Sequence, residues 1–83
     1  MTVVDVNIPK VGMSTVEVDV TAILVAVGAS VDVGQPLIEI STDKVDITVE
    51  SPARGRIHAI LIEVDDVRPV GFVAMQIATE DES

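Results

Sequence analysis

The chain has 83 residues, 5 basic against 14 acidic side chains, no cysteine and a single aromatic residue, Phe72. A chain of this length forms one domain, which buries roughly 60% of its unfolded surface. The formal net charge of −9 argues against nucleic-acid binding, because phosphates need clustered Lys and Arg. The absence of cysteine excludes disulfides and thiolate metal sites.

No segment predicts a membrane span or a signal peptide. The longest apolar run, residues 22–27, is far shorter than the ~20 residues that a bilayer requires. We therefore expect no membrane partner. We expect a bacterial cytoplasmic location, or the mitochondrial matrix if the protein is eukaryotic.

β-Branched aliphatic residues dominate, with 17 valines and 9 isoleucines against 3 leucines, which favours strands over helices. Apolar and polar residues alternate in six segments, as half-buried strands do. These segments are 4–8, 16–20, 37–40, 45–50, 60–64 and 73–77. Glycines and prolines between them mark turns. The pattern predicts an all-β fold without helices, either a sandwich or a flattened barrel.

The sequence contains an internal repeat with an offset of 37 residues. Residues 22–40 align without gaps on residues 59–77, and 7 of the 19 pairs are identical, among them Gly34 with Gly71. Two short β units that cannot bury their own apolar faces pack most simply around a pseudo-two-fold axis.

A hairpin is predicted where four polar residues, Ser41 to Lys44, separate the strands 37–40 and 45–49. Because Asp43 and Lys44 are not accompanied by glycine, a type I turn is expected rather than its mirror image. Lys44 would then lie at the tip. By residue type alone, Lys44 could simply be a solvated turn lysine.

Three motifs at their present spacing resemble the lipoyl domain of 2-oxo acid dehydrogenase complexes. They are Ile8-Pro9-Lys10-Val11-Gly12-Met13-Ser14, Thr42-Asp43-Lys44-Val45 and Ser51-Pro52-Ala53-Arg54-Gly55, together with Gly28 and Gly34 between the first two. The resemblance extends over residues 3–79. It implies a flattened sandwich of two four-stranded antiparallel sheets with internal pseudo-two-fold symmetry, formed by residues 1–79. The acidic tail, residues 80–83, would begin a linker.

The resemblance also implies a function. Lipoate would be attached by an amide bond to Lys44, which is flanked by Thr42, Asp43 and Val45. The arm would carry acyl groups and reducing equivalents between a thiamine-diphosphate 2-oxo acid decarboxylase, an acyltransferase core and dihydrolipoyl dehydrogenase. A lipoate ligase or lipoyl transferase would modify the lysine. The domain itself would have no catalytic residue and would form part of a dihydrolipoamide acyltransferase.

The chain departs from the family pattern at a few positions. Ile23 stands where tryptophan is frequent, Ser41 where an acidic residue commonly lies three before the lysine, and Asp65 where glycine is usual. Val18 and Ala29 replace a glycine and an aspartate. Ile23 can pack in place of an aromatic residue, whereas Ser41 and Ala29 lie at features that a modifying enzyme could inspect.

Two other functions remain as alternatives, a biotin carrier domain and an unmodified β-sandwich interaction module. Biotinyl domains share the fold but place methionines on both sides of the lysine, whereas Asp43 and Val45 flank Lys44 here. The sequence supports other functional sites less well. His58 is the only histidine, it is expected to face solvent, and no metal-binding set or nucleophilic serine arrangement is recognisable.

Overall fold

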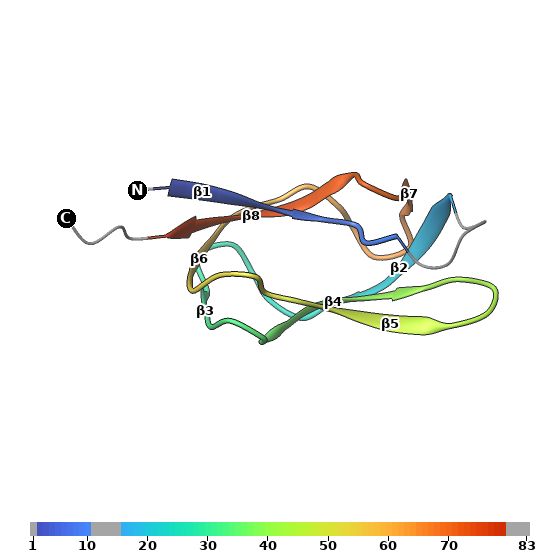
Figure 1. The fold of residues 1–83 in the computed structure, drawn as a ribbon, viewed down its shortest axis with the longest axis horizontal. Coiled ribbons are helices and arrows are strands. Elements are labelled where there is room, and N and C mark those ends of the chain that lie inside the picture. Colours follow the sequence, from blue (N-terminus) through green and yellow to red (C-terminus); the bar gives the residue numbers. More distant parts are fainter. Residues whose placement is uncertain (1, 11–15, 80–83) are drawn as a thin grey trace.

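The computed structural model describes residues 2–10 and 16–79, and within them it contains eight strands and no helix (Figure 1). The strands are β1 (Thr2–Asn7), β2 (Glu17–Ile23), β3 (Ser30–Val31), β4 (Pro36–Ser41), β5 (Asp46–Glu50), β6 (Gly55–Ile60), β7 (Val67–Pro69) and β8 (Val73–Thr79). They form two antiparallel four-stranded sheets, in the orders β1-β8-β6-β3 and β5-β4-β2-β7. The all-β sandwich predicted from the sequence is confirmed, and its sheets are not closed into a barrel.

The core lies between the two sheets and consists almost entirely of branched aliphatic side chains. Its most deeply buried members, exposed by 2% at most, include Ile8, Leu37, Ile38, Ile40, Ile57, Met75 and Ile77. Ile23, at the position where the family often has tryptophan, packs against this core as a partly buried residue. An aliphatic side chain thus fills that position, as expected.

The 37-residue repeat is reproduced in three dimensions. Adding 37 to the residue numbers of β2, β3 and β4 gives β6, β7 and β8, and the equivalent strands lie in opposite sheets. Each half therefore lends its shortest strand, β3 or β7, to the sheet of the other half. The register shift between Val20 and Ala22 recurs between Ile57 and Ala59, so even the irregularities of the ladder are repeated.

Two crossovers related by the repeat, residues 24–29 between β2 and β3 and residues 61–66 between β6 and β7, are held by equivalent hydrogen bonds. The amide of Gly28 donates to the carbonyl of Ile57, and the amide of Asp65 donates to the carbonyl of Val20, both at 2.8 Å. Gly28 and Asp65 both have positive φ, 91° and 75°. The left-handed conformation is inexpensive for glycine but strained for an aspartate, although Asp tolerates it better than most residues.

One predicted strand is wrong. The alternation over residues 60–64 does not form a strand, because β6 ends at Ile60 and residues 61–66 cross to the other sheet. Ile62 is buried while its neighbours Leu61 and Glu63 are exposed, so the alternation reflects an extended crossover segment. The short strands β3 and β7 were not predicted, because two or three residues cannot display alternation.

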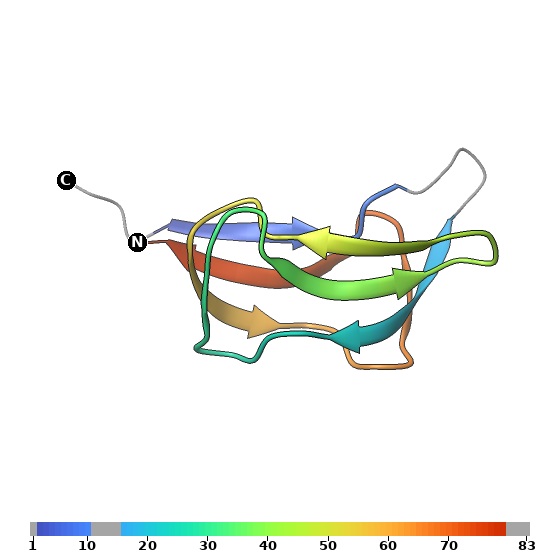
Figure 2. The ribbon, with the colours of Figure 1, turned by 90° about the horizontal axis from the view of Figure 1, so that it is seen from below.

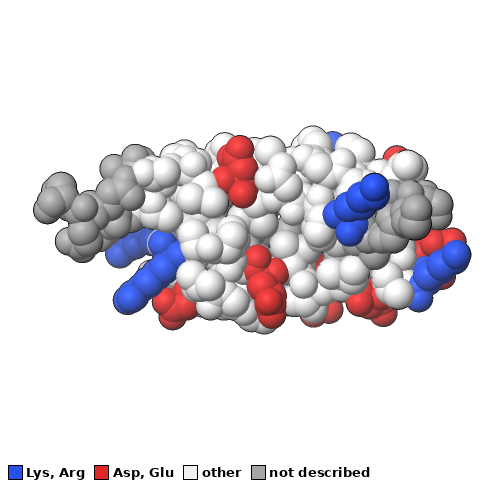
Figure 3. Space-filling view, in the orientation of Figure 1, with Lys and Arg blue, Asp and Glu red and all other residues white. Residues whose placement is uncertain are grey.

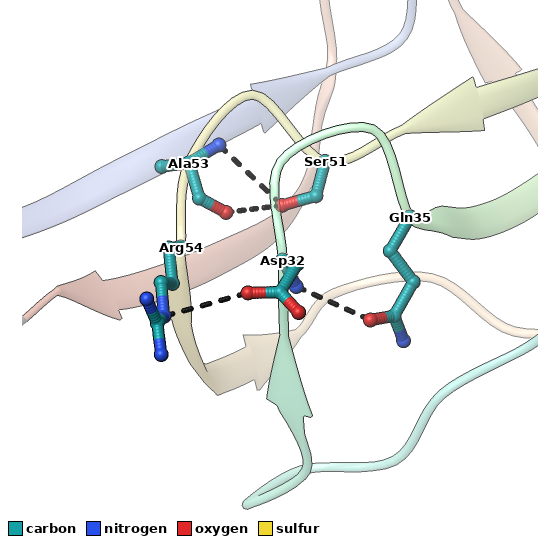
Figure 4. A network of polar contacts seen from close by, with 5 residues as sticks. All are labelled: Asp32, Gln35, Ser51, Ala53 and Arg54. Atoms are coloured by element: carbon teal, nitrogen blue, oxygen red, sulfur yellow. Dashed lines mark hydrogen bonds and ion pairs between the residues drawn. The ribbon is translucent and has the colours of Figure 1, made fainter.

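Two neighbouring loops at one end are joined by a polar network (Figure 4). The Arg54 guanidinium lies 3.4 Å from the Asp32 carboxylate, and the Asp32 amide donates to Gln35. Among the described residues Ser51 is the one buried polar residue, and its hydroxyl donates to the carbonyl of Ala53 at 2.6 Å. The Ser51–Gly55 motif therefore shapes a turn, as the sequence predicted.

A second polar contact fixes the entry into β7. The Asp66 carboxylate accepts a hydrogen bond from the Glu63 amide at 2.9 Å and pairs with Arg68 at 3.1 Å. The Glu63 amide and then Arg68 lower the pKa of Asp66, and partial burial opposes them. Arg68 also lies over the Phe72 ring at 4.8 Å. Arg68 therefore contacts both the Asp66 carboxylate and the Phe72 ring.

The predicted boundary at residue 79 remains a prediction, because the tail 80–83 lies outside the described residues. The same holds for residues 11–15 of the first motif. Within the described ranges, no helix has the length and hydropathy needed to cross a bilayer.

The positive φ of Asp65 predicts a stabilising substitution. Asp65→Gly should raise the free energy of unfolding by about 0.5–1 kcal/mol, because glycine relieves the left-handed strain. Gly28→Ala should lower it by about 1 kcal/mol, and since nothing lies within 4 Å of a Cβ placed there, the loss is conformational. Urea denaturation measures both. An Asp65→Gly variant less stable than the parent would contradict this assignment.

Candidate functional site

The predicted hairpin is formed by β4 and β5 and projects at one end of the molecule, away from the two termini (Figure 2). Asp43, Lys44 and Val45 are exposed at its tip. Ser41 and Asp46 are the last paired residues below the tip. The structure thus places Lys44 where the sequence predicted it, on a short loop held by two paired strands.

Thr42 organises the backbone of this tip through its hydroxyl group. The hydroxyl accepts hydrogen bonds from the amides of Lys44 at 3.2 Å and Val45 at 3.1 Å, and it donates to the carbonyl of Val45 at 3.2 Å. The Thr42 amide donates to the same carbonyl at 2.8 Å. One donor and two acceptors are the full capacity of a hydroxyl group, so Thr42 is saturated.

The conformation of the turn agrees with part of the expectation. Among the described non-glycine residues only Asp65 has positive φ, so Asp43 and Lys44 do not form a mirror-image turn. The Val45 amide is bound by the Thr42 side chain, however, and not by a main-chain carbonyl as in a simple type I turn. The side-chain contribution of Thr42 was not anticipated from the sequence.

A second hydrogen bond joins the strands immediately below the tip. The Ser41 hydroxyl donates to the Asp46 carboxylate at 2.7 Å, and these residues face each other in the β4–β5 ladder. A charge-assisted bond of this length is among the stronger side-chain contacts. Ser41 thus ties β4 to β5 at the base of the tip.

The Lys44 side chain makes no hydrogen bond or ion pair with any other described residue. The ion pairs seen in residues 2–10 and 16–79 are Arg54–Asp32 and Arg68–Asp66. The Lys44 ammonium is therefore exposed and unconstrained. An acyl group attached to Nζ would displace no hydrogen bond or ion pair among the described residues, so the exposed site fits an amide-linked cofactor.

The other candidates are not brought together by the fold. His58 is exposed on β6, as expected. Ser41 is bonded to Asp46 and Ser51 to Ala53, and Ser14 lies outside the described residues. Within the described part of the chain, no group of three or more His, Asp or Glu side chains could hold a metal ion.

The outer face of the sheet β5-β4-β2-β7 is strongly acidic. Its exposed positions include five carboxylates: Glu17, Asp19, Glu39, Asp46 and Glu50. Register pairing places Asp19, Ser41 and Asp46 in one row just below the tip. A shallow groove of about 220 Å³ on this face is lined by residues that include Glu39 and Asp46. Acidic side chains follow the edge where β4 and β5 lie (Figure 3).

The pseudo-symmetry provides an internal comparison for this charge. Thirty-seven residues further on, Glu17 and Asp19 correspond to Arg54 and Arg56, and Glu39 corresponds to Gln76. The backbone pairing of the two halves is equivalent, yet the charge is reversed at two of these positions and lost at the third. The fold does not require acidic residues at these positions.

The chain also matches a known protein family. The family model described as "Biotin-requiring enzyme", which covers biotin and lipoyl attachment domains, matches residues 4–77. The chain belongs to the biotinyl/lipoyl attachment family. The resemblance stated from the sequence motifs is thereby confirmed, and the general role of this family is that of a carrier domain.

A relative of this biotinyl/lipoyl domain supports the same assignment. The chain is 47% identical over 73 residues to the dihydrolipoyllysine-residue acetyltransferase component of the pyruvate dehydrogenase complex of Corynebacterium glutamicum. The alignment covers 88% of this chain but 11% of that protein. The chain therefore spans about a ninth of the length of this relative.

Proposed function

We propose that the chain is a lipoyl carrier domain and that Lys44 is its attachment site. The observation that carries the proposal is the hairpin tip, where the Lys44 side chain is exposed and makes no hydrogen bond or ion pair with a described residue, on a backbone held by Thr42. The flanking residues Asp43 and Val45 favour lipoate over biotin, since biotinyl domains carry methionines there.

The residues of the chain act as a rigid mount. When bound, lipoate supplies a dithiolane, which provides the acyl-transfer and redox chemistry that a cysteine-free chain lacks. Amide formation at Nζ removes the positive charge of Lys44. The paired strands β4 and β5 hold the attachment point at the end of the molecule, while tethering keeps the local concentration of the arm high at each active site.

The partners follow from the relative and from the family. We assign the domain to a dihydrolipoamide acyltransferase of a 2-oxo acid dehydrogenase complex, with pyruvate as the 2-oxo acid, because the relative is named as the acetyltransferase component of such a complex. The arm would visit a thiamine-diphosphate decarboxylase, the acyltransferase core and dihydrolipoyl dehydrogenase in the bacterial cytoplasm. The domain would present the arm and catalyse no step itself.

Modification of Lys44 is tested by intact mass. Incubation with lipoate, ATP and a lipoate ligase should add one lipoyl group to the wild-type chain and none to Lys44→Gln. Lys10→Gln is the matched control, since Lys10 is the only other lysine, and it should be modified like the wild type. An unmodified wild type, or a modified Lys44→Gln chain, would refute the assignment. Biotinylation by a biotin ligase in place of lipoylation would favour the biotin carrier.

The acidic face is the surface that we assign to docking on the decarboxylase. Five carboxylates without a basic side chain on the exposed positions of β2, β4 and β5 attract a basic surface, and they adjoin the hairpin that carries Lys44. Long-range attraction of this kind raises the rate of encounter and weakens with salt. Asp43 at the tip extends the same field.

Charge reversal on the two sheets tests this docking face. Glu39→Lys should weaken binding to the decarboxylase several-fold at low salt, by loss of attraction. Asp5→Lys, on the opposite sheet, should change binding little. NMR titration of the labelled domain measures both affinities, and wild-type shifts should centre on Asp43–Asp46 and weaken with salt. Equal effects of the two substitutions, or shifts confined to the far end, would contradict docking through this face.

A further inference from the structure

We propose that Thr42 is the positioning residue for modification of Lys44, acting through the two hydrogen bonds that its hydroxyl accepts. This proposal rests on Lys44 being the attachment site. The hydroxyl oxygen binds the amide of Lys44 itself and that of Val45, at 3.2 and 3.1 Å. These contacts restrain the backbone on both sides of the lysine Cα, so the direction in which the side chain leaves the tip depends on Thr42.

The pseudo-symmetry shows which hydrogen bond of Thr42 closes a strand pair and which bonds are left to position Lys44. The offset of 37 residues makes Thr79 on β8 the counterpart of Thr42. The register of the two ladders makes Thr2 on β1, which pairs with Thr79, the counterpart of Val45. The Thr79 hydroxyl donates to the carbonyl of Thr2 at 3.1 Å, just as the Thr42 hydroxyl donates to the carbonyl of Val45 at 3.2 Å. The donated bond is thus common to both ends of the molecule and closes a strand pair.

The two accepted bonds act on the tip itself. At Thr42 they come from the amides of the loop residue Lys44 and of Val45, which follows it. A two-residue loop without glycine has few internal main-chain hydrogen bonds, so a side-chain acceptor here reduces the number of conformations that the loop can adopt. A modifying enzyme that must receive Lys44 in one orientation would then bind a tip that is already ordered.

The experiment compares four chains: wild type, Thr42→Val, Thr42→Ser and Thr79→Val. Valine has the shape of threonine but no hydroxyl, and serine keeps one donor and two acceptors. Lipoylation kinetics with a lipoate ligase should show a KM for the domain raised roughly tenfold in Thr42→Val, because a smaller fraction of the tip is competent to bind. The kcat should stay near that of the wild type. Thr42→Ser should recover most of the loss, and Thr79→Val should behave as wild type.

A second measurement reads the positioning directly and does not depend on modification. In the unmodified chains, ¹⁵N order parameters at Asp43–Val45 should fall in Thr42→Val and recover in Thr42→Ser, and they should not change in Thr79→Val. Circular dichroism at the working temperature verifies that each variant is folded. The stability of both valine variants should fall, because each loses a strand-closing bond.

The outcomes are distinct. A Thr42→Val domain with wild-type kinetics and wild-type tip order overturns the proposal, as does a Thr79→Val domain that loses as much modification as Thr42→Val. A loss in kcat without a change in KM or tip order would assign Thr42 to direct contact with the ligase and would also overturn it. If the wild type is not lipoylated, the proposed function fails, and the order parameters still decide whether Thr42 orders the tip.

Discussion

The structure depends on an exchange of strands between two halves, neither of which can bury its apolar face alone. β3 leaves the half that contains β2 and β4 and pairs with β6, while β7 makes the reciprocal exchange with β2. The buried side chains at equivalent positions, such as Val20 with Ile57 and Ile40 with Ile77, then meet in one core. This arrangement lets a chain with one aromatic residue form a stable domain from branched aliphatic side chains. The hairpin with Lys44 is an extension of two strands already fixed by that core.

Carrier function and charge are separable properties of this fold. The backbone repeats itself after 37 residues down to its register shifts, but the surface does not repeat, since Asp19 is matched by Arg56 and Glu39 by Gln76. Surface residues at equivalent positions contribute little to the core, so they are free to differ. A symmetric scaffold therefore presents two unlike faces, and only one of them adjoins the lysine.

Much of this organisation could be predicted from the sequence, because period-two alternation reports a strand with one buried side. The strands around the hairpin were predicted well for that reason. The strand predicted at residues 60–64 was wrong, because a crossover segment with Ile62 buried and Glu63 exposed shows the same alternation as a strand. Lys44 was predicted as the attachment site from the family motif and not from physical chemistry, since an exposed turn lysine looks like any other. The hydroxyl bonds of Thr42 could not be foreseen, because they depend on the conformation of the loop that they stabilise.

The equivalence of Thr42 with Thr79 bears on the distance that an arm attached to Lys44 could reach. The first pair of strands is closed by Asp43 and Lys44, and the corresponding pair, β8 with β1, is open at the chain ends (Figure 1). Lys44 and the ends of β1 and β8 therefore lie at opposite ends of a body with extents of 44 × 22 × 18 Å. A neighbouring domain tethered beyond Thr79 and an arm carried on Lys44 would thus be attached at opposite ends of this domain. The length of the domain itself would then add to the distance over which the arm could travel.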